Sequence, residues 1–295
     1  MTERVTPLEM TPEQFRRAGH EVVERIADLL ATIRTRPVTS GETPAEIRAL
    51  LGRRPLPRSG SDPVKLLAET APLLLEHSLY NGHPRFMGYI TSSAAPIGAL
   101  ADALAAAINP NVGAWELSPI ATEIEAETVR WVAELVGYPV ECGGLLVSGG
   151  NMANFVCFLA GRRAMLGEAP RTGGLAGAGA TRPRVYVSEE THAWVQKAAD
   201  LFGLGTDAIR WIATDDRHRM RVDRLEESIR ADRAGGDTPI MVVGTAGSVS
   251  TGTVDPLREI AEVCREERLW FHVDGAYGAP AAILPDAPAD LNHLA

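Results

Sequence analysis

The sequence predicts an α/β protein with a mostly parallel sheet flanked by helices. From about residue 91, short apolar runs alternate with stretches whose apolar residues recur at helical spacing, which is the pattern of βαβ units. Polar and small residues directly follow several apolar runs, as expected where parallel strands end at one edge of a sheet. The chain has 295 residues, of which 45% are hydrophobic and 23% charged, so it is long enough for two domains of ordinary globular composition.

The first ninety residues are predicted to form a helical arm. Residues 11–34 form a helix in this prediction, because Thr11 can cap it, Pro12 suits its first turn and Gln14 completes a capping box. An extended connector rich in Pro, Gly, Arg and Ser follows over 35–62, and then a short helix around 63–79. Such an arm has apolar helix faces but no core of its own, so we expect it to pack on the main domain or on a second subunit.

The rest of the chain, residues 91–295, is predicted to be a second and larger domain. Helices are expected over 94–108, 118–137, 151–166, 192–202, 222–231 and 256–267. The apolar runs predicted as strands are 144–147, 184–187, 209–213, 240–244 and 269–273. The last helix is expected to begin with Asp255 as N-cap and Pro256 at its first position. The glycine-rich segment 173–183 is expected to be a surface loop.

Bulk properties exclude several classes of function. A net charge of -9 argues against general binding to nucleic acid or to anionic membranes. The three cysteines form no CxxC pair and no metal-type spacing, so we expect a reducing compartment, no disulfide framework and no metal site. The N-terminus has charges where a signal peptide needs an apolar run, and the most apolar stretch, 94–108, is too short to span a bilayer and contains Asp102. We therefore expect a cytoplasmic protein.

Four segments that contain candidate binding or catalytic residues follow four predicted strands. They are SGGNMAN (148–154), SEETHAW (188–194) with His192, TAGSVSTG (245–252) with Thr245 and Ser248, and Asp274 followed by small residues. Because parallel strands present their carboxyl ends at one edge, we expect all four segments at one rim of the sheet. Taken singly, SGGNMAN and Asp274 are equally compatible with ordinary turns, His192 alone is more typical of a surface histidine at a helix start, and Thr245 and Ser248 indicate little.

Taken together, the four segments fit pyridoxal 5′-phosphate. Backbone amides at Gly149, Gly150 and Asn151 would bind the phosphate at a helix N-terminus. His192 could stack on one face of the ring, and Ala276 is small enough to lie against the other. Asp274 would pair with the pyridine nitrogen and keep it protonated, which makes the ring an electron sink.

At these residues the chain resembles the group II pyridoxal-phosphate-dependent amino-acid decarboxylases, which include enzymes for aromatic amino acids, glutamate, histidine and diaminobutyrate. The resemblance runs from about residue 80 through GHPRFMGYITSSAAP (82–96), 109–139, SGGNMAN, 188–203 and 245–279. It implies a fold-type I large domain with an N-terminal arm that embraces a partner subunit, and an active site at a homodimer interface. The resemblance also places Tyr89 and Ile90 in the substrate pocket.

One departure from the family concerns the lysine that forms its Schiff base. The family carries this lysine downstream of the HVD segment, typically in a His-Lys pair, whereas the only lysines here are Lys65 and Lys197. We therefore expect a truncated protein or partial gene model, which lacks that lysine and the small C-terminal domain and cannot form the cofactor's Schiff base.

The resemblance implies decarboxylation of an L-amino acid, of aromatic type, to its amine and carbon dioxide in the full-length protein. Three alternatives stay open. The reaction could be that of an aminotransferase or of an aldehyde-forming decarboxylase, or the chain could be a non-catalytic, lysine-less fragment that binds the cofactor. A Rossmann-type nucleotide enzyme is disfavoured, because no GxGxxG motif follows an early strand.

Overall fold

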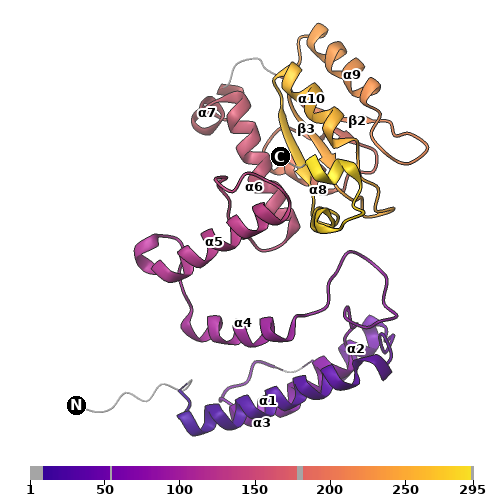
Figure 1. Cartoon of the computed structure of the whole chain (residues 1–295). Helices are drawn as coiled ribbons and strands as arrows, with labels where there is room; N and C mark the ends of the chain where they lie inside the picture. The colour runs from indigo at the N-terminus through magenta and orange to yellow at the C-terminus, as the bar shows by residue number, and fades with distance from the viewer. Residues whose placement is uncertain (1–8, 54, 178–181, 294–295) are drawn as a thin grey trace. The chain divides into compact units, whose positions relative to one another are not determined.

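The computed structural model describes residues 9–53, 55–177 and 182–293. Its contacts divide the chain into two compact units, Met1–Ala107 and Ile108–Ala295 (Figure 1). The predicted boundary after residue 90 falls within the first unit, and the roles of arm and cofactor domain stay predictions. Among the described residues, none of the helices combines the length and the apolar character needed to cross a bilayer.

The first unit is helical. Helix α1 (Pro12–Thr32) begins as predicted, with Thr11 and Gln14 exchanging both bonds of a capping box. It packs against α3 (Pro63–Glu76), and α4 (Pro96–Ile108) follows. The predicted extended connector is wrong in part, because it contains α2 (Pro44–Leu51). The reason is a second capping box, in which Thr43 accepts from the Glu46 backbone and the Glu46 carboxylate accepts from Thr43.

The second unit is built on a four-stranded parallel sheet, as predicted. Its strands are β1 (Pro183–Ser188), β2 (Ile209–Ile212), β3 (Thr238–Thr245) and β4 (Trp270–Asp274), in the order β2-β1-β3-β4. Neighbouring strands are all parallel. The carboxyl ends of β1, β3 and β4 therefore lie side by side at one edge of the sheet.

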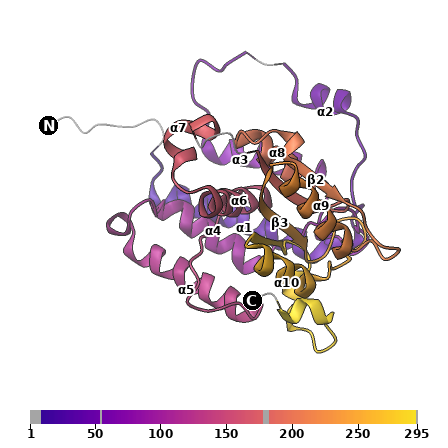
Figure 2. The ribbon, with the colours of Figure 1, turned by 90° about the horizontal axis from the view of Figure 1, so that it is seen from above.

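Helices cover both faces of this sheet. On one face, Val185 and Val187 of β1 share a core with residues of α6 (Gly150–Leu166) and α8 (Trp194–Leu201). On the other, Tyr186 and Val242 share a core with α9 (Val222–Ala234) and α10 (Leu257–Glu267). Alternate residues of a strand thus enter opposite layers, and Figure 2 shows α6 and α10 on different sides of β3. The remaining elements are α5 (Pro119–Leu135), α7 (Ala169–Gly177) and short 3₁₀ turns at Ile33–Thr35, Trp115–Leu117, Thr206–Ala208, Ala279–Ile283 and Ala289–His293.

Three local predictions in the second unit are also wrong. Residues 144–147 form no strand: Leu145 and Leu146 are exposed, and the Leu146 N–H donates to the Glu125 carboxylate of α5 at 2.7 Å instead of to a neighbouring strand. Residues 173–177, predicted as loop, belong to α7, which is kinked at Gly174, while 178–181 lie outside the described residues.

The third wrong prediction concerns Asp255, which does not cap α10. The helix begins at Leu257 without a side-chain cap. The Asp255 carboxylate instead accepts from the backbone N–H of Met220 at 2.7 Å and of Thr245 at 2.9 Å. Asp255 thereby ties the carboxyl end of β3 to the chain before α9, and burial raises its pKa to about 6.

Candidate functional site

The end of the β3–β4 pair brings two of the predicted residues together. Thr245 and Asp274 are register partners at the last position of this parallel pair. The backbone continues the contact, since the Ala246 N–H donates to the Asp274 carbonyl at 2.9 Å. The predicted rim is therefore confirmed for these two strand ends.

The Asp274 side chain accepts three hydrogen bonds. Its Oδ2 accepts from the indole Nε1–H of Trp194 at 2.8 Å and from the Asn154 amide at 3.3 Å. Its Oδ1 accepts from the backbone N–H of Ala276 at 3.2 Å. A carboxylate offers about four lone-pair sites, two on each oxygen, so among these contacts Oδ2 is filled and Oδ1 keeps one acceptor position.

A buried histidine extends this network behind Asp274. His272 Nε2 lies 2.7 Å from Asn154 Oδ1, and the His272 ring meets the Trp194 ring edge-on, with centroids 5.3 Å apart. Because the Asn154 amide donates to Asp274, its oxygen must accept, and His272 therefore carries its proton on Nε2. Burial lowers the pKa of His272 to about 4, so this ring is neutral at physiological pH.

His192 lies in the loop between β1 and α8. Its ring is exposed, and its Nδ1 accepts from the backbone N–H of Trp194 at 3.2 Å. In the neutral ring the proton is then on Nε2. Trp194 thus contacts both polar side chains that the sequence assigned to the ring of the cofactor, through its backbone at His192 and through its indole at Asp274.

The glycine segment forms the N-terminus of α6. Gly149 is the N-cap residue, with φ +93° and ψ 164°, a conformation essentially restricted to glycine, and no side chain caps the helix. Nothing lies within 4 Å of the position that a Cβ would take at Gly149 or Gly150, and Asn151 is exposed. The helix itself packs on β3 and β4. The segment therefore offers first-turn N–H groups to an anion, although the strand predicted before it is absent.

The two predicted hydroxyl groups differ in their surroundings. Thr245 is buried, and its Oγ1 has no hydrogen-bond partner within the described parts of the chain. Ser248 is also buried, but its Oγ pairs with Thr251 Oγ1 at 2.8 Å inside the following turn. The Thr245 hydroxyl is thus buried and unpaired among the described residues, whereas Ser248 stabilises the turn.

Tyr89 and Ile90 belong to the first unit. Both are exposed, and Tyr89 has a positive φ of 59°. Their assignment to a substrate pocket stays a prediction.

Sequence reasoning missed the residues that hold Asp274. Trp194 lies in SEETHAW, Asn154 in SGGNMAN and His272 in a predicted strand, but these patterns predict no role for their side chains. A signal existed for Asn154, because it stands four positions before Phe158 and therefore on the same face of the helix as that apolar residue. For Trp194 the sequence carried no such signal, since a buried tryptophan in an apolar helix face is normally a core residue.

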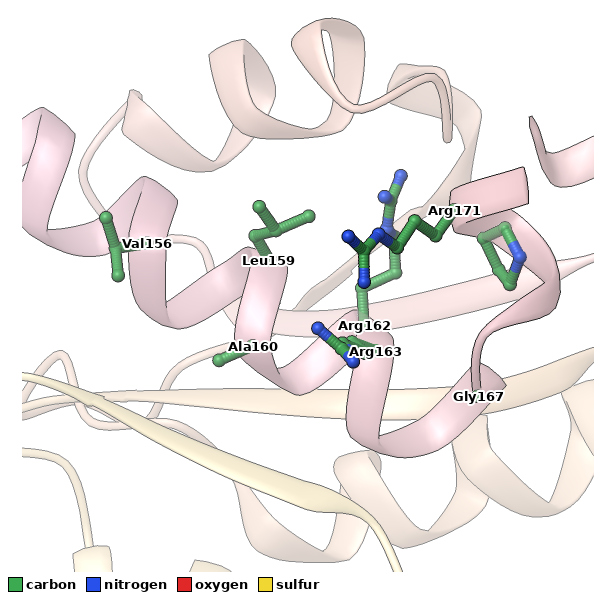
Figure 3. Close-up of a pocket in the computed structure, with 8 residues that line it drawn as sticks. Val156, Leu159, Ala160, Arg162, Arg163, Gly167 and Arg171 are labelled. Atoms are coloured by element: carbon green, nitrogen blue, oxygen red, sulfur yellow. The ribbon is translucent and has the colours of Figure 1, made fainter. Parts of the chain in front are cut away.

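The second unit also has a cavity of about 580 Å³ at the C-terminal half of α6. Figure 3 shows Val156, Leu159 and Ala160 along its apolar side, and Arg162, Arg163 and Arg171 gathered at its other end. Arg163 pairs with Glu168, and Arg162 donates to the Phe202 carbonyl. The helix has 17 residues and is about 25 Å long, so these arginines lie far from the glycines at its start.

Comparison with known proteins gives the same assignment as the motifs. The pyridoxal-dependent decarboxylase conserved domain matches residues 54–293. An aromatic-L-amino-acid decarboxylase of Bacillus atrophaeus is 32% identical over 97% of this chain and 58% of its own length. An L-2,4-diaminobutyrate decarboxylase of Rhizobium meliloti is 31% identical over 90% of this chain and 51% of its own length.

The fold also matches solved structures of this kind. The structure of Oryza sativa TDC with PLP and tryptamine has a TM-score of 0.85 and 28% identity, and the match covers 96% of this chain and 58% of that one. The described fold is thus that of the fold-type I enzymes, and the chain spans a little more than half the length of the proteins it matches. With a family match over most of its residues, the chain belongs to the pyridoxal-dependent decarboxylases.

Proposed function

We propose that the whole protein to which this chain belongs is a lyase that decarboxylates an L-amino acid, using pyridoxal 5′-phosphate bound at the ends of β3 and β4. The observation that carries the proposal is the pairing of Thr245 with Asp274 at that rim. Among the described residues, the hydroxyl of Thr245 is buried without a partner, and Asp274 keeps one acceptor position on Oδ1. Family membership supplies the reaction class.

The residues at the rim fit this cofactor. Gly149, Gly150 and Asn151 would hold the phosphate with backbone N–H groups, where the open space at both glycines lets an anion approach the helix. Thr245 Oγ1 would contact the cofactor with its free hydroxyl. Asp274 Oδ1 would accept a hydrogen bond from the N–H of the protonated pyridine nitrogen, and His192 and Ala276 would flank the ring.

When bound, the cofactor supplies an electron sink for the bond that breaks between Cα and the carboxylate. This chain contributes the negative charge of Asp274, which keeps the ring nitrogen protonated and the ring electron-withdrawing. Asp274 holds a proton at the pyridine nitrogen, and its own orientation is fixed by Trp194 and Asn154. His272, behind them, is neutral and donates to Asn154, so it adds no competing charge.

For the substrate we propose an aromatic amino acid. The segment 109–119 resembles aromatic-type members, and one relative is named as an aromatic-L-amino-acid decarboxylase. Another relative at similar identity is named for diaminobutyrate, so family membership alone does not select the side chain. Tyr89 and Ile90 would contribute to the pocket, in a cytoplasmic homodimer whose N-terminal arms embrace the partner subunit.

A second candidate is a chain that binds the cofactor without catalysis. It is favoured by the positions of the two lysines: Lys197 is exposed on α8, and Lys65 lies 3.8 Å from Glu69 on α3 of the first unit. Neither belongs to the network around Asp274. Borohydride reduction followed by mass spectrometry separates the candidates, since modification of Lys65 or Lys197 with measurable turnover would contradict both this candidate and the expected downstream lysine.

Product analysis of the full-length gene product tests the proposed reaction. An amine and carbon dioxide in equal amounts are expected from an aromatic L-amino acid. Release of a keto acid would indicate an aminotransferase, and release of an aldehyde would indicate an aldehyde-forming decarboxylase. Either product in place of the amine would contradict the proposal.

A further inference from the structure

The carboxylate proposed to face the cofactor is held by a tryptophan of the hydrophobic core. Trp194 is fully buried in the core between α6, α8 and the sheet, yet its indole nitrogen reaches the rim and donates to Asp274 Oδ2 at 2.8 Å. The Asn154 amide donates to the same oxygen from α6. Two elements far apart in sequence thus converge on a single carboxylate oxygen.

This arrangement makes the two oxygens of Asp274 unequal. Oδ2 has two donors, at 2.8 and 3.3 Å, whereas Oδ1 has only the Ala276 N–H at 3.2 Å among the described residues. A side chain with one oxygen fixed in this way cannot turn freely about its last torsion. Oδ1 is left as the oxygen available to a donor that enters the site.

The donors are themselves fixed. The Trp194 ring meets Phe158 of α6 edge-on, with centroids 6.2 Å apart, and it also meets His272 of β4 edge-on. The Asn154 amide is oriented by His272, which donates to its oxygen. Packing and hydrogen bonds therefore determine the direction of both N–H groups, as preorganisation of a binding group requires.

We propose that Trp194, together with Asn154, is a positioning residue that aims Asp274 Oδ1 at the pyridine nitrogen of the cofactor. The inference rests on the proposed function, because it assigns Asp274 to that nitrogen. It adds a specific cause for the orientation of Asp274, which is the hydrogen bond from the Trp194 indole N–H to Oδ2. The same residue anchors His192 through its backbone N–H, so one side chain and its backbone link both groups assigned to the ring.

The test compares pyridoxal 5′-phosphate with 1-deazapyridoxal 5′-phosphate, which has carbon in place of the ring nitrogen. Affinities of both compounds for the 295-residue chain are measured by calorimetry, and the preference is the ratio of the two. The wild-type chain is expected to prefer the natural cofactor. Trp194→Phe keeps a ring in the core but removes the N–H, and it should lower the preference about three- to tenfold, the scale of freeing one ordered side chain.

Phe158→Leu is the matched control. It disturbs the same buried cluster and touches the Trp194 ring, but Phe158 makes no hydrogen bond to Asp274. Its preference should equal that of the wild type even if its melting temperature falls as much as that of Trp194→Phe. A loss of preference in both variants would indicate a general packing effect and overturn the proposal.

Asn154→Ala provides a second variant in case Trp194→Phe does not fold. It removes the other donor to Oδ2 and should lower the preference in the same direction. A wild-type preference in folded Trp194→Phe, or in Asn154→Ala if only that variant folds, would overturn the inference and leave the proposed function intact. A wild-type chain that binds both compounds equally, or neither, would instead overturn the assignment of Asp274 and with it the inference.

Discussion

The indole nitrogen of Trp194 lies 2.8 Å from Oδ2 of Asp274, although 80 positions separate the two residues in the sequence. The contact joins the segment after β1 to the end of β4, across the intervening strand β3. It makes a core residue part of the site, because the ring is buried in the hydrophobic layer while its N–H reaches the rim. The stability of this layer and the geometry of the site are therefore coupled.

His192→Ala should weaken both cofactor binding and turnover. The exposed ring is held in place through its Nδ1, and stacking on the cofactor is expected to contribute about 0.5–1.5 kcal/mol. Titration with pyridoxal 5′-phosphate should show a loss of about three- to tenfold in affinity. His20→Ala, which removes an exposed histidine of α1, is the control and should bind like the wild type. Equal affinity in all three proteins would contradict the stacking role.

Gly149→Ala should impair anion binding at the start of α6. The φ of +93° suits only glycine there, so alanine either strains the backbone by about 1–3 kcal/mol or moves the first-turn N–H groups. Gly167→Ala, with a φ of +68° at the other end of the helix, imposes a similar strain away from the rim. We expect both variants to melt earlier, but only Gly149→Ala to lose affinity for pyridoxal 5′-phosphate. If Gly167→Ala lost as much affinity for pyridoxal 5′-phosphate, the effect of Gly149→Ala would not come from the proposed phosphate site.

Asp255→Asn should change how stability depends on pH. Burial raises the pKa of Asp255 from about 3.8 to about 6, so the folded chain binds this proton more tightly than the unfolded chain does. The contribution to stability is therefore fully present below pH 4 and is lost as pH rises to 6. The shift corresponds to about 3 kcal/mol.

Urea unfolding between pH 4 and pH 7.5 measures this contribution. Other carboxylates, such as Asp215 with its pKa lowered to about 2 by bonds from Arg219, act equally in both proteins and cancel in the comparison. The free energy of unfolding of the wild type should fall relative to that of Asp255→Asn as pH rises, and then stay level above pH 6. Parallel curves would show that Asp255 keeps an ordinary pKa in the folded chain.

Gly161→Ala should destabilise the second unit. A Cβ at this position of α6 would meet Met241 Cε at 2.5 Å and the Trp270 ring at 2.7 Å, so the helix could no longer lie as close to β3 and β4. Overpacking of this kind costs about 1–3 kcal/mol. Gly19→Ala, in α1 with nothing within 4 Å, should instead stabilise its helix by about 0.5–1 kcal/mol. Thermal unfolding followed by circular dichroism compares them, and an unchanged melting temperature for Gly161→Ala would contradict the close packing.

Local signals predicted most of the fold. The four strands of the sheet coincide with short apolar runs, and α1 begins at a capping box that is visible in the sequence. The prediction failed where tertiary contacts override local pattern. Residues 144–147 are apolar enough for a strand but have no strand partner, and the carboxylate of Asp255 serves two distant N–H groups and not the helix that follows it.

For the candidate site, the sequence predicted where its residues lie in the sheet but not how they are held. The order of motifs along the chain sufficed to place Thr245 and Asp274 at one edge of the sheet, because parallel strands present their carboxyl ends there. That the two strands are direct neighbours emerges only from the structure. Which side chains hold Asp274 could not be predicted, since that depends on the rotamers of Trp194 and Asn154 in a packed core. The free state of the Thr245 hydroxyl and the engaged state of Ser248 likewise follow from three-dimensional contacts alone.

The protonation state of the bound cofactor's ring nitrogen tests the central claim most directly. Pyridoxal 5′-phosphate labelled with ¹⁵N at that position reports by its chemical shift whether the nitrogen carries a proton. Bound to the wild-type chain at pH 7.5, the nitrogen should be protonated, and bound to Asp274→Asn it should be neutral, with turnover of the full-length variant reduced on the order of 10²-fold or more. A neutral nitrogen in the wild type, or a protonated one in both proteins, would contradict the pairing of Asp274 with the cofactor.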